Sequence, residues 1–294
     1  MPTVVFIDGA PFAPEHAVVS VFDRGFLYGD SVFETIRTYS GRCFALTEHV
    51  ARLARSARSV FIDLPLPAQE LEAEIERAVA HAGNPESYVR VMITRGSGPM
   101  GLDTSFDAKP RRVIIAGPLA SPPPESYEHG IDVITYRTLR TAEATEASSA
   151  KIGNYLVAVL ALREARAAGA AEALIVDGSG NVVEGASSNV FAVIDGQLCT
   201  PPETAGILPG ITRAVILELA EVSLRPLSVD DLGRAEEIFI TSSIRELLPV
   251  VHVDGAAVGD GKPGPRAREL HRRFLEKVSN IMAMGSGAGS LKGP

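Results

Sequence analysis

The sequence of 294 residues is poor in the features that mark several specialised classes of protein. Its two cysteines, Cys43 and Cys199, lie far apart with no histidine at ligand spacing, so neither a disulfide scaffold nor a metal site is expected. No apolar run approaches the roughly 20 residues of a membrane span, and no signal sequence is recognisable. The net charge of −8 disfavours nucleic acid, because phosphate binding needs clustered positive charge. We therefore expect a cytoplasmic protein without a membrane or nucleic-acid partner.

Strand and helix patterns divide the chain into two parts. Residues 32–39 alternate apolar and polar side chains, which predicts a strand. Residues 121–126 contain three consecutive prolines, which favour neither a helix nor a central strand and suggest a domain boundary. The chain is predicted to have a small domain, a linker, a large domain and a disordered tail, at 1–119, 120–130, 131–284 and 285–294. Helices and strands mix without the alternation of a doubly wound sheet, so the predicted fold class is α+β in two lobes.

Helix boundaries can be predicted from capping residues and turns. Thr47 is the expected N-cap of a helix that continues to Val60. A helix is expected over 155–168, where Gly169 would end it, and another from the turn at Pro209 to about residue 222.

Lys151 differs in its setting from the other four lysines, which lie on expected loops, a terminal helix or the tail. It precedes a largely apolar segment predicted to be helical, and a lysine near a helix N-terminus is disfavoured by the helix dipole. The same field would lower the pKa of its amine, which suits attack on an aldehyde. On general grounds a solvated lysine is the commoner case, so this position alone leaves both interpretations open.

Three further segments contain groups that can bind a charged ligand. Glu184 lies between an apolar pair and a cluster of small residues, where a ligand can approach the backbone. Pro209–Arg213 leads into a helix whose first amides attract phosphate, and Thr241–Ile244 offers hydroxyl groups and amides. Each segment alone is equally compatible with a hairpin or a capped turn. A lysine, a carboxylate and two anion-binding turns are together the parts that a pyridoxal phosphate site requires.

The motifs around these residues resemble those of the class IV aminotransferases. They are Lys-x-Gly-Asn-Tyr-Leu from Lys151, Asp-Gly-x-Gly-x-Val-x-Glu-Gly from Asp177, Gly-Ile-Leu-Pro-Gly-Ile-Thr-Arg from Gly206 and Thr-Ser-Ser-x-x-Glu from Thr241. Residues 23–37 and 48–57 are similar to the small-domain signature and first helix of the family. The resemblance implies a two-lobed fold type IV enzyme with pyridoxal 5′-phosphate between the lobes, in a homodimer.

The resemblance also implies roles for individual residues. Lys151 would carry the cofactor as a Schiff base and move the α-proton, and Glu184 would pair with the pyridine nitrogen. Tyr155 matches the tyrosine that hydrogen-bonds the phenolic oxygen. The family's phosphate-binding positions are matched by Arg52, Ile211, Thr212 and Ser243. His49 and Arg55 match no ligand position and are interpreted as structural or solvated.

A second set of residues matches substrate positions of branched-chain aminotransferases. These are Tyr28, Arg37, Tyr88 and Arg90. Arg95 and the amides around Ser243 and Ile244 are further candidates for binding the substrate α-carboxylate. Arg37 is the first choice because strand alternation places it on one face with Phe33. The alternative is a solvated arginine or one at the rim of the dimer.

Some sequence signals point to other members of the family. Thr35 and residues 26–29 and 243–249 are similar to 4-amino-4-deoxychorismate lyases, which release pyruvate and form 4-aminobenzoate. Residues 95–97 lack the histidine that D-amino acid aminotransferases carry there. We therefore predict transamination between a branched-chain-like amino acid and a 2-oxo acid such as 2-oxoglutarate. The lyase is the alternative, and the D-amino acid enzyme ranks third.

Overall fold

The computed structural model describes residues 2–107, 109–138 and 149–283. The chain forms two compact units. The first contains the residues up to Ala120, the short segment Ala150–Asn154 and, at the end of the described chain, residues 280–283. The second contains the chain from Ser121 to Ser279 apart from that segment.

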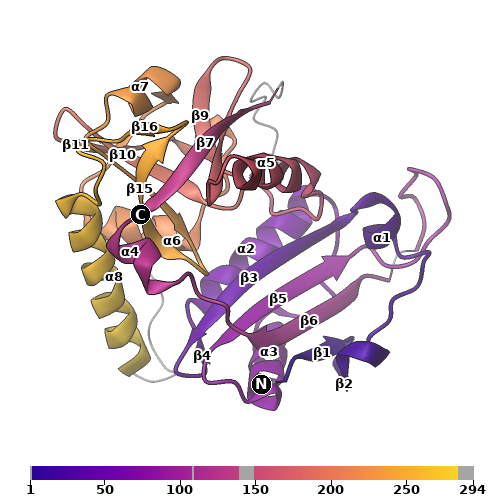
Figure 1. Cartoon of the computed structure of the whole chain (residues 1–294). Coiled ribbons are helices and arrows are strands. Elements are labelled where there is room, and N and C mark those ends of the chain that lie inside the picture. Colours follow the sequence, from indigo (N-terminus) through magenta and orange to yellow (C-terminus); the bar gives the residue numbers. More distant parts are fainter. Residues whose placement is uncertain (1, 108, 139–148, 284–294) are drawn as a thin grey trace. The chain divides into compact units, whose positions relative to one another are not determined.

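The first unit is built on a six-stranded antiparallel sheet in the order β2-β1-β6-β5-β3-β4 (Figure 1). Its strands are β1 (Val4–Ile7), β2 (Ala10–Phe12), β3 (Ser31–Tyr39), β4 (Arg42–Cys43), β5 (Ser87–Thr94) and β6 (Arg111–Pro118). Its helices are η1 (Pro14–His16), α1 (Arg24–Tyr28), α2 (Leu46–Ser59) and α3 (Ala68–Ala82).

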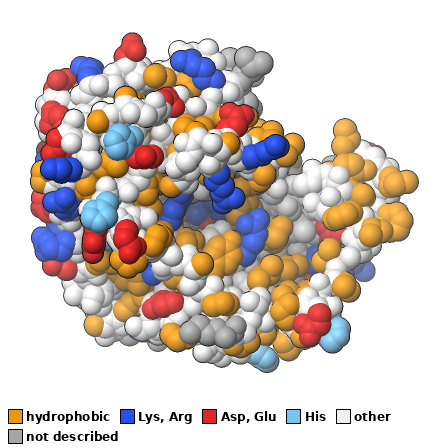
Figure 2. All heavy atoms as spheres, in the orientation of Figure 1, with side chains coloured by type: hydrophobic (Ala, Val, Ile, Leu, Met, Phe, Trp, Pro, Cys, Tyr) orange, Lys and Arg blue, Asp and Glu red, His pale blue; other side chains and the backbone are white. Residues whose placement is uncertain are grey.

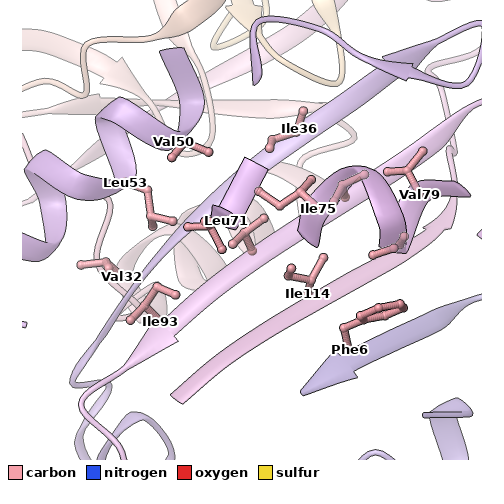
Figure 3. Packing of buried hydrophobic residues seen from close by; sticks show 14 of the residues in the cluster. Phe6, Val32, Ile36, Val50, Leu53, Leu71, Ile75, Val79, Ile93 and Ile114 are labelled. Carbon is pink, nitrogen blue, oxygen red and sulfur yellow. The ribbon is translucent and has the colours of Figure 1, made fainter. Parts of the chain in front are cut away.

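Helices α2 and α3 cover one face of this sheet and enclose its hydrophobic core (Figures 1 and 3). Leu53 of α2 and Leu71 and Ile75 of α3 are fully buried, and they pack with Val32 and Ile36 of β3. Burial of each such side chain stabilises the fold by about 1.5–3 kcal/mol. Because side chains alternate along a strand, Glu34 points toward the helices together with Val32 and Ile36, whereas Phe33 and Thr35 point toward the opposite face.

The second unit contains a ten-stranded mixed sheet in the order β12-β11-β10-β14-β15-β7-β8-β9-β13, with β16 paired to β15. Its strands are β7 (Ile131–Arg137), β8 (Glu172–Val176), β9 (Asn181–Gly185), β10 (Asn189–Ile194), β11 (Gln197–Thr200), β12 (Ser223–Leu224), β13 (Leu227–Ser228), β14 (Glu237–Ser242), β15 (Glu246–Val253) and β16 (Ala256–Ala257). Its helical elements are α4 (Pro124–Glu128), α5 (Leu156–Ala167), η2 (Glu203–Ala205), α6 (Ile211–Leu219), α7 (Val229–Gly233) and α8 (Pro265–Ala283). None of the helices in the described part of the chain is long and apolar enough to cross a membrane.

Three sequence-based expectations about elements are corrected. Helix α4 begins at Pro124 inside the supposed linker, because proline is tolerated in the first turn of a helix. Helix α2 begins after Ala45, which adopts a left-handed conformation, so Thr47 lies inside the first turn and is not the cap. Helix α6 ends at Leu219 because Ala220 is extended and leads into β12.

The division into units also differs from the predicted domains. Residues 150–154 were assigned to the large domain but belong to the first unit, because they hydrogen-bond to β3. The predicted linker at 120–130 falls almost entirely in the second unit. The predicted tail at 285–294 lies outside the described residues.

Candidate active site

Lys151 belongs to a short extended segment that pairs with the beginning of β3. The Phe33 N–H donates to the Lys151 carbonyl at 2.9 Å, and the Gly153 N–H donates to the Ser31 carbonyl at 2.8 Å. Glycine at position 153 allows this close approach, since an added Cβ would lie 2.1 Å from Ser31 Oγ. Lys151 precedes the first residue of α5 by five positions, and a helix dipole acts mainly within the first turn. The expected influence of the dipole on Lys151 therefore does not apply.

The Lys151 side chain is half-buried and lies against an aromatic ring. Its Nζ is 4.8 Å from the centroid of the Phe33 ring, within the range of a cation–π interaction. Its backbone N–H donates to Ser56 Oγ of α2 at 3.1 Å. The lysine is therefore held by its backbone on two sides, which distinguishes it from a solvated surface lysine.

The face of the sheet opposite the core brings several predicted substrate residues together. In the register of β3 and β5 the opposed pairs on this face are Phe33 with Met92, Thr35 with Arg90, and Arg37 with Tyr88. The Arg90 guanidinium lies 3.8 Å from the centroid of the Phe33 ring, and Arg37 lies 4.3 Å from that of Tyr39. Arg37 is only 9% exposed, so it is not a solvated side chain in the described fold.

A buried carboxylate, Glu34, organises the α2 side of β3. Arg52 donates to it through Nε and Nη2, both at 2.7 Å, and His49 Nδ1 lies 2.8 Å from Glu34 Oε2. Burial alone would raise the pKa of Glu34, but the charge and hydrogen bonds of Arg52 and the hydrogen bond of His49 outweigh it and hold that pKa well below its ordinary value. Burial lowers the pKa of His49, with further lowering by the charges of Arg52 and Lys151, despite the opposing effect of Glu34.

Arg95 is bound within the first unit in a way that does not suit a substrate role. Its guanidinium donates to Asp30 through Nε and Nη2 at 2.7 and 3.0 Å. It also donates to the carbonyls of Phe61 and Val60 at 2.6 and 2.8 Å. Burial would raise the pKa of Asp30, but Arg95 and Arg24 outweigh it and lower that pKa. We therefore interpret Arg95 as a structural residue that holds a loop, in contrast to the expectation from the sequence.

Tyr28 ends α1 and is 40% exposed. Its hydroxyl accepts a hydrogen bond from the Gly101 N–H at 2.8 Å. The guanidinium of Arg24 lies 4.9 Å from the centroid of the Tyr28 ring and donates to the Gly101 carbonyl at 2.8 Å. The loop around Gly101 therefore sets the orientation of the tyrosine.

In the second unit, Glu184 lies on β9 opposite Ile175 of β8. Its Oε2 accepts a hydrogen bond from the Leu208 N–H at 3.0 Å. The Leu208 carbonyl in turn accepts from Asn189 Nδ2 at 2.8 Å. The carboxylate is therefore fixed by the turn that leads into α6, unlike the side chain of an exposed hairpin.

The beginning of α6 presents backbone amides without a side-chain cap. Gly210 is its N-cap residue and provides no capping hydrogen bond, while Ile211 and Thr212 in the first turn are buried. A Cβ at Gly210 would lie 2.0 Å from Asn189 Oδ1, so the tight approach of this turn requires glycine. The first amides of a helix have no partner within the helix and favour an anion.

Ser243 and Ile244 form the turn between β14 and β15. The residue that precedes this turn by two positions, Thr241, is 1% exposed, and its Oγ1 has no hydrogen-bond partner among the described residues. Tyr155 is half-buried and is the residue immediately before α5. The structure thus places Glu184, Ile211, Thr212, Ser243, Ile244 and Tyr155 in the second unit, and the other predicted site residues in the first.

Glu34 and His49 are the neighbours of the site that we did not predict from the sequence. Glu34 occupies a position between Val32 and Ile36 that faces the core, where an ionised carboxylate needs a cation. His49 and Arg52 are three residues apart and therefore share one side of α2. A carboxylate on an apolar strand face, followed by this pair on a helix, was the signal that could have identified the cluster.

Comparison with known proteins identifies the family. The model of the "Amino-transferase class IV" family matches residues 31–253. A "Putative branched-chain-amino-acid aminotransferase" from Methanocaldococcus jannaschii is 40% identical over 92% of this chain and 95% of its own length. A D-alanine aminotransferase from Staphylococcus haemolyticus is 36% identical over 95% of this chain and 99% of its own.

The solved structures agree with this assignment. A branched-chain amino acid aminotransferase from Escherichia coli has a TM-score of 0.85 and 33% identity, and 94% of each chain is covered. Another branched-chain amino acid aminotransferase, solved with pyridoxamine 5′-phosphate, has a TM-score of 0.88 and 32% identity over 94% of each chain. The predicted fold class is thereby confirmed. The chain belongs to the class IV aminotransferases and is a pyridoxal-phosphate-dependent enzyme.

Proposed function

We propose that this aminotransferase moves an amino group between a branched-chain-like amino acid and a 2-oxo acid such as 2-oxoglutarate. The observation that carries the proposal is the position of Lys151 against Phe33, on a sheet face that also presents Met92, Arg90 and Arg37. Apolar and cationic side chains on one face suit a donor that has an aliphatic side chain and an α-carboxylate. The branched-chain relatives support the same donor class.

The groups present fit pyridoxal phosphate. Lys151 supplies an amine, and Glu184 supplies a carboxylate that Leu208 already orients. The uncapped first turn of α6 offers amides to a phosphate, and the buried Thr241 hydroxyl lies close in sequence to the Ser243 turn. When bound, pyridoxal phosphate supplies an electron sink for the negative charge that develops at the substrate α-carbon.

Each residue then has a defined task. Lys151 Nζ would hold the cofactor and move the proton at the α-carbon, and Glu184 would keep a proton at the pyridine nitrogen. Ile211, Thr212 and Ser243 would bind the phosphate, and Tyr155 would donate a hydrogen bond to the phenolic oxygen. Arg52 is also proposed to face the phosphate, with its orientation set by Glu34.

The substrate carboxylate needs a cation or several donors, because a buried unpaired carboxylate is very costly. The residues proposed for this role are Arg37, Arg90, Tyr28, Tyr88, Ser243 and Ile244. Arg37 remains the first choice among the cations, since it is buried on the face that carries Phe33.

We also propose a homodimer in the cytoplasm. Large hydrophobic side chains are exposed on the first unit near α1 and the loop beside it, at the right of Figure 2. They are Val18, Val19, Val21, Phe22, Phe26, Met100 and Leu102. An exposed apolar group of this kind favours association. Both cysteines are free, which suits a reducing compartment. Light scattering should give twice the chain mass of 31.1 kDa, whereas a monomer would refute the dimer.

One assay on a single preparation tests the proposed reaction. The protein would be offered L-leucine with 2-oxoglutarate, D-alanine with 2-oxoglutarate, and aminodeoxychorismate alone. We expect glutamate formation with L-leucine to be the most efficient of the three. A higher kcat/KM with D-alanine would show that the donor is a D-amino acid. Release of pyruvate from aminodeoxychorismate as the main activity would show that the protein is a lyase and not a transaminase.

A further inference from the structure

Arg245 follows Ser243 and Ile244 directly and forms contacts that reach across the second unit. Its Nη2 donates to the carboxylate of Glu172, and to the Ser187 hydroxyl and carbonyl at 2.8 and 3.2 Å. Its Nε and its backbone N–H both donate to Ser242 Oγ, at 3.4 and 3.2 Å. The side chain therefore spans the distance from its own turn to residues at the beginning of β8 and after β9.

Glu172 is a fully buried carboxylate with several donors around it. It accepts hydrogen bonds from the Ala173 N–H at 3.0 Å, the Ser187 hydroxyl at 3.0 Å and the Ser188 hydroxyl at 3.2 Å. Within the described ranges, the ion-pair partner of Glu172 is Arg245. A buried carboxylate is retained only where a cation and hydrogen bonds compensate for its lost hydration, so Glu172 holds Arg245 firmly.

The same network reaches the strand that carries Glu184. Ser187 and Ser188 follow Gly185, whose N–H donates to the Ser188 carbonyl at 2.7 Å. A Cβ at Gly185 would lie 2.1 Å from Ser188 Oγ, so the packing here is close. Arg245 thus connects the turn of Ser243 and Ile244 to the turn at the end of β9.

The backbone next to Arg245 adopts a conformation that needs support. Glu246 has φ 56°, a left-handed conformation that costs a residue with a side chain roughly 1–2 kcal/mol. The Glu246 carboxylate is fixed by His271 Nε2 at 2.8 Å on the C-terminal side of the turn. On the N-terminal side, Arg245 contacts Glu172 and Ser242, and its carbonyl accepts a hydrogen bond from the Tyr127 hydroxyl at 3.4 Å.

We propose that Arg245 is a positioning residue that, held by Glu172, keeps the amides of Ser243 and Ile244 oriented toward the substrate carboxylate. The proposal rests on the proposed function in one respect, namely that this turn binds the carboxylate. Arg245 itself does not touch the substrate. Its removal, or the removal of Glu172, should therefore loosen the turn and weaken carboxylate binding more than it slows the chemical step.

Arg245→Met and Glu172→Gln in the holoenzyme, alone and combined, test this role. The matched control is Arg272→Met, which removes an exposed arginine paired with Glu276 on α8. Kinetics would give KM and kcat for 2-oxo acid and amino acid, hydrogen exchange would follow the amides of residues 243–246, and thermal unfolding would report stability. A further measurement is the dissociation constant of 4-methylpentanoate, a carboxylate that carries no amino group.

We expect KM and the 4-methylpentanoate dissociation constant to rise about tenfold in each single variant, because a misplaced turn binds the carboxylate less well. The change in kcat should stay within about threefold, and exchange of the turn amides should become faster. The double variant should show no further rise in KM but regain thermal stability, since no buried charge is left unpaired.

Other results would overturn the proposal. If Glu172→Gln left KM unchanged while Arg245→Met raised it, Arg245 would bind the substrate directly. If KM recovered together with thermal stability in the double variant, the effect would be one of stability alone. Unchanged exchange at residues 243–246 would show that the turn does not depend on Arg245. If the wild-type protein transaminated no donor, the proposed function would fail, whereas hydrogen exchange and 4-methylpentanoate binding would still decide the role of Arg245.

Discussion

The two units hold their charged and polar site groups by different means. In the first unit, carboxylates fix arginines, as the buried Glu34 does with Arg52 and the partly buried Asp30 does with Arg95. In the second unit, the buried carboxylate of Glu172 also fixes an arginine, Arg245, but the groups offered to a ligand are backbone amides of turns and of a helix terminus, as at Gly210 before α6. Removal of one member of a buried ion pair leaves the other uncompensated, whereas an amide remains when its own side chain is replaced. Side-chain substitutions should therefore be more damaging in the first unit, and the variants below test how far this holds.

The largest effect is expected for Lys151→Ala in the first unit. No other group at this place can supply the amine, so kcat should fall by roughly a thousandfold or more. The purified wild type should be yellow, with an absorbance that shifts when an amino donor is added, and the variant should lose the borohydride-reducible link to the cofactor. A variant that kept this link and full turnover would refute the assignment of Lys151.

Glu184→Gln tests the comparison from the second unit, because here the loss of a side chain, and not of a backbone amide, should be damaging. A carboxylate paired with the pyridine nitrogen makes a charge-assisted hydrogen bond, and its loss should slow the half-reaction by about 10²–10³-fold. Cofactor binding should be largely kept, because the amide of glutamine can still accept from Leu208. Glu221→Gln, on an exposed side chain, is the control. Unchanged single-turnover rates would reduce Glu184 to a structural residue of β9.

Arg37→Ala should have the next largest effect. If Arg37 pairs with the α-carboxylate, KM for amino acids should rise about 10–100-fold, whereas efficiency with the decarboxylated amine should hardly change. Arg55→Ala is a suitable control, because Arg55 is exposed on α2. Comparable efficiency for an amino acid and its amine, unaffected by Arg37→Ala, would place the carboxylate elsewhere.

Sequence reasoning succeeded where the signal is local. The alternation in β3 and the motifs around Lys151 and Glu184 can be read from neighbouring residues, and both the fold class and the family followed from them. Long-range partners could not be read in this way. The partner of Arg95, Asp30, lies 65 positions away, and no local pattern indicates this contact. The pairing of the Lys151 segment with β3 likewise depends on tertiary structure and has no local signal.

The arrangement of charges around Glu34 also predicts a dependence of stability on pH. The pKa of Glu34 is lowered from 4.5, so its contribution to stability is complete above pH 4.5 and is lost as the pH falls below that value. The pKa of His49 is lowered from 6.5, so below pH 6.5 the unfolded chain binds a proton that the folded chain does not. Both groups therefore destabilise the protein in acid, and His49 does so first.

His49→Gln should have the smallest effect, because glutamine still provides a hydrogen-bond donor for Glu34. The variant separates the pH dependence that comes from His49 from that of Glu34. The midpoint of thermal unfolding would be compared for wild type and variant at pH 7.5, 5.5 and 4.0. Between pH 7.5 and 5.5 the wild type should lose more stability than the variant, by at most about 1.4 kcal/mol in total, because only one pH unit of this range lies below 6.5. Glu34 is present in both proteins, so its contribution should be lost from both at pH 4.0. An equal loss between pH 7.5 and 5.5 would show that His49 takes up its proton as readily in the folded protein as in the unfolded chain, so that at pH 5.5 the buried cluster of the first unit carries one more positive charge than proposed.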